Sequence, residues 1–374
     1  MWYIQSDLIF YGFTISFHRS KEVFVCCLIV SLRCVFWVAP FIRGWGIDSP
    51  RPASQRAAAF ILTAAMLTTL AAPAFAGTWY IEDGDITVKA GETKGTNKVS
   101  QGANQEVEDT DTIITNRNEG TASSNTVTID ANGKNDKVEV TLKDVNIDTS
   151  SRNKAAVSVT GSGNTTIKLD GDNALKSDTS RSGIYGSGSL TISGGENDSL
   201  TAQGGSGANG ISSSGSLTIS GGTVTANGDD GGHGIYSRGS ITISGGSTVT
   251  ANGRSGTISG GDGIRSDGGV TISGGTVNAT GGNGGTISGG DGIRSGGGLT
   301  VSDGTVTAKG GNGDSKDGYG GDGIRSGGVV TISGNTVNAA GGYGGKVGGY
   351  GICSFDRVAI SGGTVEAAGG NGNN

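Results

Sequence analysis

A seven-residue phrase, Gly-Gly-Asp-Gly-Ile-Arg-Ser, occurs three times without change and carries charged side chains that could do chemistry. Its copies lie at 260–266, 289–295 and 320–326, so the cations are Arg265, Arg294 and Arg325. If each copy lies on a neighbouring strand, the three guanidinium groups stand about 5 Å apart on one face. Like charges at that distance repel unless something neutralises them. We call these three residues the Arg row.

Two kinds of partner could neutralise the Arg row. An Asp precedes each Arg by three residues, so an internal Asp–Arg ladder is the structural interpretation. An anionic polymer with matching charge spacing is the functional one, because the guanidinium fork suits carboxylates such as those of uronic acids. Tyr185 and Tyr236 occupy the Arg position in earlier units, where their rings would offer surfaces for sugars. The predicted ligand-binding residues are therefore Tyr185, Tyr236, Arg265, Arg294 and Arg325.

The Asp residues of the same phrase are also a candidate metal site. Carboxylates and loop carbonyls are the hard oxygen ligands that Ca²⁺ prefers. The known calcium-binding nonapeptide contains Gly-Gly-x-Gly-x-Asp, but here Arg265 stands where that Asp should be. We therefore keep calcium as a candidate cofactor in another arrangement, with Asp262, Asp291 and Asp322 as the predicted metal residues.

Catalysis is the weaker interpretation of these charges. A polysaccharide lyase would need carboxylates that hold calcium and one Arg or Lys that acts as base. An active site is a unique place, whereas these residues are copied three times. His233, the one His after residue 76, has no Ser or Cys partner at a telling spacing, and Cys353 has no activating neighbour. We predict no enzymatic activity and no catalytic residue.

An internal repeat must position these columns. An anchoring Ile recurs every 24 to 31 residues, and Val127 and Val157 fit the same role in two earlier units. Each unit holds three short segments that alternate apolar and polar residues, as in Leu190-Thr191-Ile192, which is typical of strands. We predict an all-β, right-handed parallel β-helix with three strands per coil and about nine coils. The leucine-rich phrase is absent, and the in-phase alternation argues against a disordered Gly/Ser linker.

A change in composition near residue 77 divides the chain into four parts. Residues 51–76 resemble a signal peptide, with Arg51 and Arg56 before an apolar stretch and Ala74-Phe75-Ala76 as the cleavage site. A buried core helix is the alternative for that segment. Residues 1–50 are a doubtful leader, either an over-extended gene start or an extra membrane segment. We assign residues 77–125 to an N-terminal cap with irregular coils and residues 126–374 to the repeats.

The charge and cysteine content of the exported part limit its partners. Six of the 27 basic and three of the 33 acidic residues precede Gly77, which leaves a net charge of −9. That charge disfavours nucleic acid, whose phosphates need a basic surface. Cys353 is the one Cys left, so no internal disulfide can form. We expect a secreted or cell-surface protein without stable membrane insertion after signal cleavage, and the sequence leaves its oligomeric state open.

Several phrases of the repeat resemble a known family. They are Thr165–Leu175 (TTIKLDGDNAL), Ser182-Gly183-Ile184 and Ser189–Gly195 (SLTISGG). Over roughly residues 77–370 the chain resembles the carbohydrate-binding β-helix domain of Gram-positive and gut bacteria. The resemblance implies a pectate-lyase-like fold, binding of cellulose and acidic plant polysaccharides, and bound calcium, with no ligand position carried over.

The predicted function is non-catalytic binding of an acidic, plant-type extracellular polysaccharide. A polysaccharide lyase and an adhesin or structural surface spacer are the alternatives. Ice binding is a further alternative, because a row of outward Thr residues is typical of ice-binding β-helices. Thr is also common in strands for its β propensity alone. The row comprises Thr191, Thr218, Thr242, Thr271, Thr300 and Thr331.

Overall fold

The computed structural model describes residues 8–10, 13–15, 76–118 and 120–373. The chain forms two compact units, Met1–Ala71 and Ala72–Asn374. In the first unit, β1 (Leu8–Phe10) pairs with β2 (Phe13–Ile15) in an antiparallel sense. The rest of the predicted leader, and the predicted signal peptide up to residue 75, lie outside the described residues.

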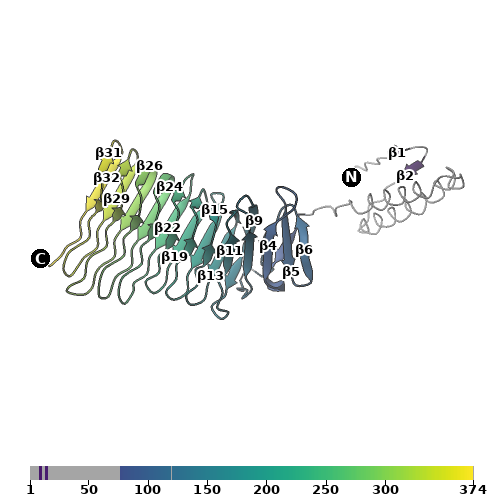
Figure 1. Ribbon diagram of the computed structural model, residues 1–374, viewed down its shortest axis with the longest axis horizontal. Helices are drawn as coiled ribbons and strands as arrows, with labels where there is room; N and C mark the ends of the chain where they lie inside the picture. Colours follow the sequence, from purple (N-terminus) through teal and green to yellow (C-terminus); the bar gives the residue numbers. More distant parts are fainter. Residues whose placement is uncertain (1–7, 11–12, 16–75, 119, 374) are drawn as a thin grey trace, which may run out of the picture. The chain divides into compact units, whose positions relative to one another are not determined.

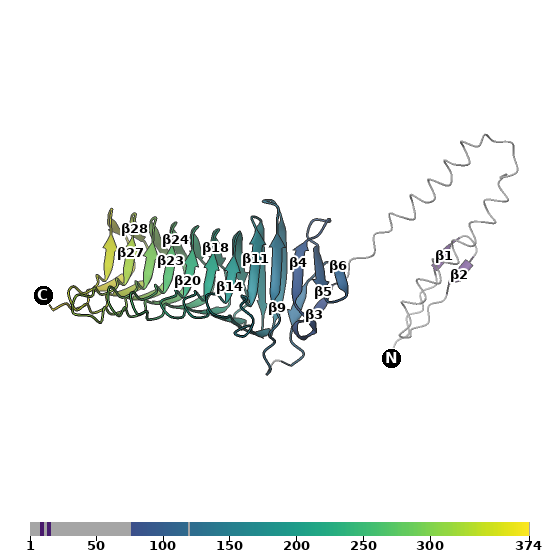
Figure 2. The same ribbon diagram turned by 60° about the horizontal axis from the view of Figure 1, so that its bottom comes forward.

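The second unit is a parallel β-solenoid of about nine turns, as the repeat predicted (Figures 1 and 2). One turn runs through β14 (Ile184–Gly186), β15 (Ser189–Ser193) and β16 (Ser199–Gln203) before the next anchoring Ile begins β17. Strands of successive turns pair in parallel, with Ile184 opposite Ile211. The right-handed sense of the coil stays a prediction.

The anchoring strands form one sheet along the axis, visible in Figure 2 as a row of parallel arrows. Besides β14, its strands are β8 (Val127–Ala131), β11 (Val157–Gly161), β17 (Ile211–Ser213), β20 (Ile235–Ser237), β23 (Ile264–Ser266), β25 (Ile293–Ser295), β27 (Ile324–Ser326) and β30 (Ile352–Ser354). Each short strand presents its central residue outward and its two end residues toward the interior, as the buried–intermediate–buried pattern of β23 illustrates.

The other two strands of each turn belong to a second sheet. Besides β15, the second position holds β9 (Lys137–Lys143), β12 (Asn164–Asp170), β18 (Leu217–Ile219), β21 (Ile241–Ile243), β28 (Val330–Ile332) and β31 (Val358–Ile360). Besides β16, the third position holds β10 (Asn146–Asp148), β13 (Asp172–Lys176), β19 (Thr223–Asn227), β22 (Thr248–Asn252), β29 (Thr336–Ala340) and β32 (Thr364–Ala368).

In two turns the second and third strands, predicted as separate segments, are joined into one long strand. β24 (Val270–Thr280) and β26 (Leu299–Lys309) each run through the second and third positions without a break. Their mutual register shifts between Ile272 and Thr276. Gly275 has a φ of 77° at this bulge, which a residue with a Cβ rarely adopts, so glycine lets the strand bend and continue.

The interior is a narrow column of apolar side chains. Leu190 and Ile192 of β15 are fully buried, and the Thr between them points outward. Val224 and Ala226 repeat the pattern in the third position. The β-branched residues favour the pleated backbone, and their alternation buries one face of every strand.

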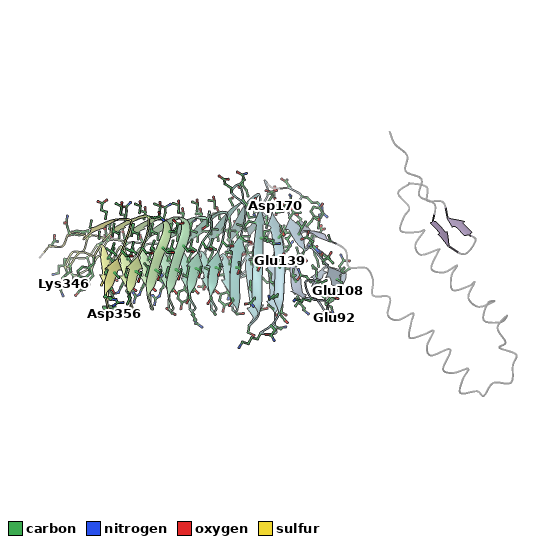
Figure 3. The ribbon with its side chains drawn as sticks, turned by 90° about the horizontal axis from the view of Figure 1, so that it is seen from above. Glu92, Glu108, Glu139, Asp170, Lys346 and Asp356 are labelled. Atoms are coloured by element: carbon green, nitrogen blue, oxygen red, sulfur yellow. The ribbon has the colours of Figure 1, made fainter. Side chains whose placement is uncertain are left out.

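The N-terminal end of the solenoid carries an antiparallel meander. It consists of β4 (Ile86–Ala90), β5 (Asn97–Gln101) and β6 (Asn104–Asp109), and β4 also pairs in parallel with β8. Next to it lie β3 (Thr78–Tyr80), the 3-10 helix η1 (Ile81–Asp83) and β7 (Ile113–Thr115). Figure 3 shows charged side chains such as Glu92 and Glu108 around this end. Among the described residues, no helix is long and apolar enough to span a membrane.

Gly-rich loops link the third strand of each later turn to the next anchoring strand and stack on one another (Figure 1). Their backbones form a zigzag of hydrogen bonds, in which Gly282 N–H donates to Gly261 O and Gly290 N–H donates to Gly282 O, both at 2.8 Å. A Cβ on Gly290 would lie 2.0 Å from Gly261 O. Only glycine permits this close approach, and the packed loops form one wall of the site described next.

Candidate functional site

The Arg row forms as predicted, on the outward side of the anchoring sheet. Arg265 lies opposite Arg294, and Arg294 opposite Arg325, at the centres of β23, β25 and β27. Paired strands lie about 4.8 Å apart, which sets the spacing of the three side chains. Their side chains are 34%, 44% and 37% exposed, so all three can contact a ligand.

The Asp residues of the repeated phrase form a hydrogen-bonded ladder within the fold. The Oδ1 atoms of Asp262, Asp291 and Asp322 accept the backbone N–H of Asp291, Asp322 and Tyr350, one turn further on, each at 2.7 Å. All three Asp residues are at least 95% buried. Each carboxylate thereby satisfies an N–H that would otherwise lack a partner in the interior. We call these three residues the Asp ladder.

Other side chains take the same role in earlier turns. Asn209 Oδ1 accepts the N–H of His233 at 2.8 Å, and His233 Nδ1 accepts the N–H of Asp262 at 2.7 Å. His233 is therefore neutral with its proton on Nε2, and burial lowers its pKa accordingly. The position requires an acceptor, and Asn, His and Asp all supply one.

The second carboxylate oxygens of the Asp ladder face the Arg row. The distance from Arg Nη1 to Asp Oδ2 is 3.8 Å for Arg265–Asp262, 3.8 Å for Arg294–Asp291 and 3.5 Å for Arg325–Asp322. The first two distances are too long for hydrogen bonds. Oδ2 of Asp262 and of Asp291 are buried and have no hydrogen-bond partner. The predicted Asp–Arg pairs thus exist as ion pairs that leave guanidinium donors free.

Stacked carboxylates in a buried column resist ionisation. Burial, reinforced by the neighbouring Asp262 charge, raises the pKa of Asp291 to about 7. Burial also raises the pKa of Asp322. Near pH 7 Asp291 is therefore partly protonated, and Arg294 beside it is only partly neutralised.

The Arg row and the Asp ladder form the floor of a groove of about 620 Å³, which we call the Arg groove. The Gly-rich loops contribute its wall through Ile287, Tyr319, Val347 and Tyr350. Bridges between Ser288 and Tyr319 and between Tyr319 and Val347 hold the loops in register. These wall side chains are 38–57% buried, so apolar and aromatic surface faces the groove.

Sequence reasoning missed this wall. The loops differ in length, so their residues do not fall in phase with the anchoring Ile. A usable signal exists all the same, because an apolar or aromatic side chain precedes the ladder position by three or four residues in each later unit.

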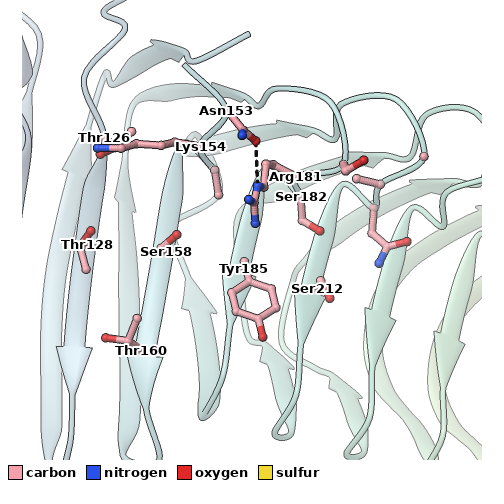
Figure 4. A pocket seen from close by; sticks show the side chains of 15 residues that line it. Thr126, Thr128, Asn153, Lys154, Ser158, Thr160, Arg181, Ser182, Tyr185 and Ser212 are labelled. Carbon is pink, nitrogen blue, oxygen red and sulfur yellow. Dashed lines mark hydrogen bonds between the residues drawn. The ribbon is translucent and has the colours of Figure 1, made fainter. Parts of the chain in front are cut away.

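The two predicted tyrosines share the outward row but not the Arg groove. Tyr236 donates its hydroxyl hydrogen to Asp267 Oδ2 at 2.8 Å, and the Arg265 guanidinium lies 5.9 Å from its ring centre. Tyr185 lies three turns before Arg265 and lines a separate pocket of about 710 Å³ (Figure 4). The five predicted ligand residues therefore form one row but not one site.

The Asp ladder does not suit Ca²⁺. One oxygen of each carboxylate already accepts a backbone N–H, and a guanidinium faces the other. Among the described residues, no group of three or more His, Cys, Asp or Glu side chains is placed to hold a metal. The three remaining carboxylate oxygens alone are fewer than the six to eight oxygen ligands that Ca²⁺ takes.

The remaining candidates carry less chemistry. Burial raises the pKa of Cys353, so its thiol is not activated as a nucleophile. The predicted Thr row is in register from Thr191 to Thr331 on the outer face of the second sheet. The Thr row lies on the second strand of each turn, whereas the Arg row lies on the anchoring strand, so the two rows are on different sheets of the solenoid.

Comparison with known proteins gives one match. The family model described as "Carbohydrate-binding domain-containing protein" matches residues 108–373. This range includes every turn from β8 to β32 and therefore both the Arg groove and the Tyr185 pocket. No curated protein and no solved structure matches the chain.

Proposed function

The chain belongs to this family of carbohydrate-binding domains, and from that premise we propose that its Arg groove binds an acidic polysaccharide laid along the solenoid axis. The observation that carries the proposal is the register of the Arg row. It places one cation per turn, about 4.8 Å apart, with donors that the Asp ladder leaves unbonded. A linear polymer of uronic acids carries one carboxylate on each sugar residue, and guanidinium groups bind carboxylates with charge-assisted hydrogen bonds.

The wall of the groove supports a sugar ligand. Tyr319 and Tyr350 are 43% and 62% exposed, and both line the groove. Aromatic rings offer flat apolar surface for the C–H faces of sugar rings, while the Arg row holds the acidic groups. A ligand with carboxylates along one edge and apolar faces between them fits both surfaces.

The proposed role is binding without catalysis. Three Arg–Asp pairs follow one another, and the neighbour that distinguishes the first of them is His233. Its Nδ1 already accepts the N–H of Asp262, so that nitrogen is not available as a catalytic base. Release of unsaturated product from pectate in the presence of calcium would overturn this point and establish a lyase. If no glycan binds at all, a passive surface spacer is the better account.

The proposed location is outside the cell. Over residues 51–76, basic residues are followed by an apolar stretch and then by small residues, an order that favours export. The net charge of −9 after residue 76 suits a surface protein and disfavours nucleic acid as its partner. Extracellular polysaccharide is the partner we propose. Calcium is not part of the binding mode that we propose for the Arg groove.

Binding of polygalacturonate tests the proposal, with cellulose as a neutral comparison. We expect the R265A/R294A/R325A variant to lose at least tenfold in affinity for polygalacturonate, because three charge-assisted contacts disappear. The matched control is R254A/K309A/R357A, which removes the same charge from three exposed positions that do not line the groove. Equal affinities of the two triple variants would refute the Arg groove as the binding surface.

A further inference from the structure

The Tyr185 pocket has a chemistry of its own. Tyr185 is the central residue of β14, and its neighbours in the outward row are Ser158 and Ser212. These small side chains leave the Tyr185 ring 43% exposed. Within the described part of the chain, Tyr185 makes no side-chain hydrogen bond and no ring contact. Unlike Tyr236, its ring is therefore free to accept a ligand.

A cation stands at the rim of the same pocket. Figure 4 shows Arg181, from the turn before β14, with its side chain directed toward the Tyr185 ring. Its Nε donates a long hydrogen bond of 3.4 Å to Asn153 Oδ1. Across residues 76–118 and 120–373, no carboxylate lies within 4.0 Å of its guanidinium. Lys154, which also lines the pocket, is by contrast paired with Asp85 at 2.9 Å.

The rest of the lining is neutral and polar. Hydroxyl groups come from Thr128, Ser158, Thr160 and Ser212, and none of the lining residues is acidic. Asn209 Oδ1 accepts the N–H of His233, so the NH₂ group of the Asn209 side chain remains as a donor. One free ring, one cation without an acidic partner and several small hydrogen-bonding groups surround a single cavity.

We propose that this pocket is a second carbohydrate site, which binds one sugar residue bearing a carboxylate. The sugar ring stacks on Tyr185, and its carboxylate accepts hydrogen bonds from Arg181. The inference rests on the proposed function only in taking carbohydrate as the ligand class. Three turns, or about 14 Å at 4.8 Å per turn, separate Tyr185 from Arg265, so one monosaccharide cannot contact both sites.

The probe for this site is free D-galacturonate, with D-galactose as its neutral counterpart. Binding is measured by saturation-transfer NMR and by calorimetric titration of the full chain. We expect Tyr185→Ser to weaken galacturonate binding at least tenfold and Tyr185→Phe to retain it, because stacking needs the ring and not the hydroxyl. Ser already occupies the same row position one turn before and one turn after, so Tyr185→Ser should fold normally.

Arg181→Gln separates the two halves of the contact. It should reduce galacturonate affinity to that of galactose while leaving galactose binding unchanged. Equal galacturonate binding by the wild type and Tyr185→Ser would overturn the proposal. So would loss of monosaccharide binding in R265A/R294A/R325A, since the ligand would then occupy the Arg groove.

The two sites fail independently in this design. Polygalacturonate binding that depends on the Arg row, without any galacturonate binding at Tyr185, would overturn the second site and leave the Arg groove standing. Galacturonate binding that depends on Tyr185, without an effect of the Arg triple variant on polymer binding, would do the reverse.

Discussion

Replacing Asp291 with Asn should stabilise the protein at alkaline pH and leave it nearly unchanged at acidic pH. The pKa of Asp291 is raised to about 7 by burial, against 3.8 for a free side chain. Below pH 3.8 the carboxyl is protonated in both the folded and the unfolded state, so Asp291 does not lower the free energy of unfolding there. As pH rises toward 7, only the unfolded state loses its proton readily, and stability falls.

The size of the effect follows from the shift. About three pH units at 1.36 kcal/mol each correspond to about 4 kcal/mol lost by pH 8. That pKa already includes the attraction of Arg294. Relaxation of the surroundings of a charged Asp291 reduces the figure, so we expect Asp291→Asn to gain about 1–3 kcal/mol there. Asn keeps the oxygen that accepts the Asp322 N–H, and in an earlier turn Asn209 accepts the His233 N–H from the corresponding position.

Urea unfolding followed by circular dichroism at pH 4, 6 and 8 measures this difference. Midpoints are compared, because a stack of repeats need not unfold in one step. Asp314→Asn, at an exposed carboxylate outside the ladder, is the matched control. A midpoint for Asp291→Asn that is no higher than wild type at pH 8, or a gain of equal size at pH 4, would refute the reasoning about the buried column.

Three further predictions concern binding and packing. Polygalacturonate affinity should rise several-fold from pH 8 to pH 6, because the proton taken up by Asp291 uncovers Arg294 in the Arg row, and Asp291→Asn should flatten that profile in calorimetric titrations. Gly290→Ala should lower the thermal midpoint by several degrees, since its Cβ would meet a backbone oxygen at 2.0 Å, whereas Gly246→Ala, with nothing within 4 Å, should not. Ile264→Ala should cost about 2–5 kcal/mol in denaturant unfolding, because the side chain is fully buried in the axial column, and a loss below about 1 kcal/mol would contradict a close-packed interior.

The strand architecture could be predicted because its signal is local and repeated. Alternation in segments such as Leu190–Ile192 fixes which side chains face inward, and the recurring Ile fixes how turns align. The Arg row followed from the same periodicity and is confirmed by the register of β23, β25 and β27.

The roles of side chains at the loop ends could not be predicted in the same way. Whether Asp291 faces a metal, a ligand or a backbone N–H depends on where the next turn's amide lies, and that position is set by loop packing. The same packing brings Tyr319 over the groove from a loop whose length differs from its neighbours. Contacts between turns, rather than preferences within one, decide these features.

Each copy of the seven-residue phrase supplies one Arg–Asp pair, so the number of cations in the Arg groove equals the number of copies. Duplicating one of these units would lengthen the Arg groove by one cation and one carboxylate. The N–H of the new Asp would find its acceptor in the Asp of the preceding copy. Deleting one unit would shorten the Arg groove by the same step. The length of polymer that the Arg groove can hold is therefore set by the number of copies of the seven-residue phrase.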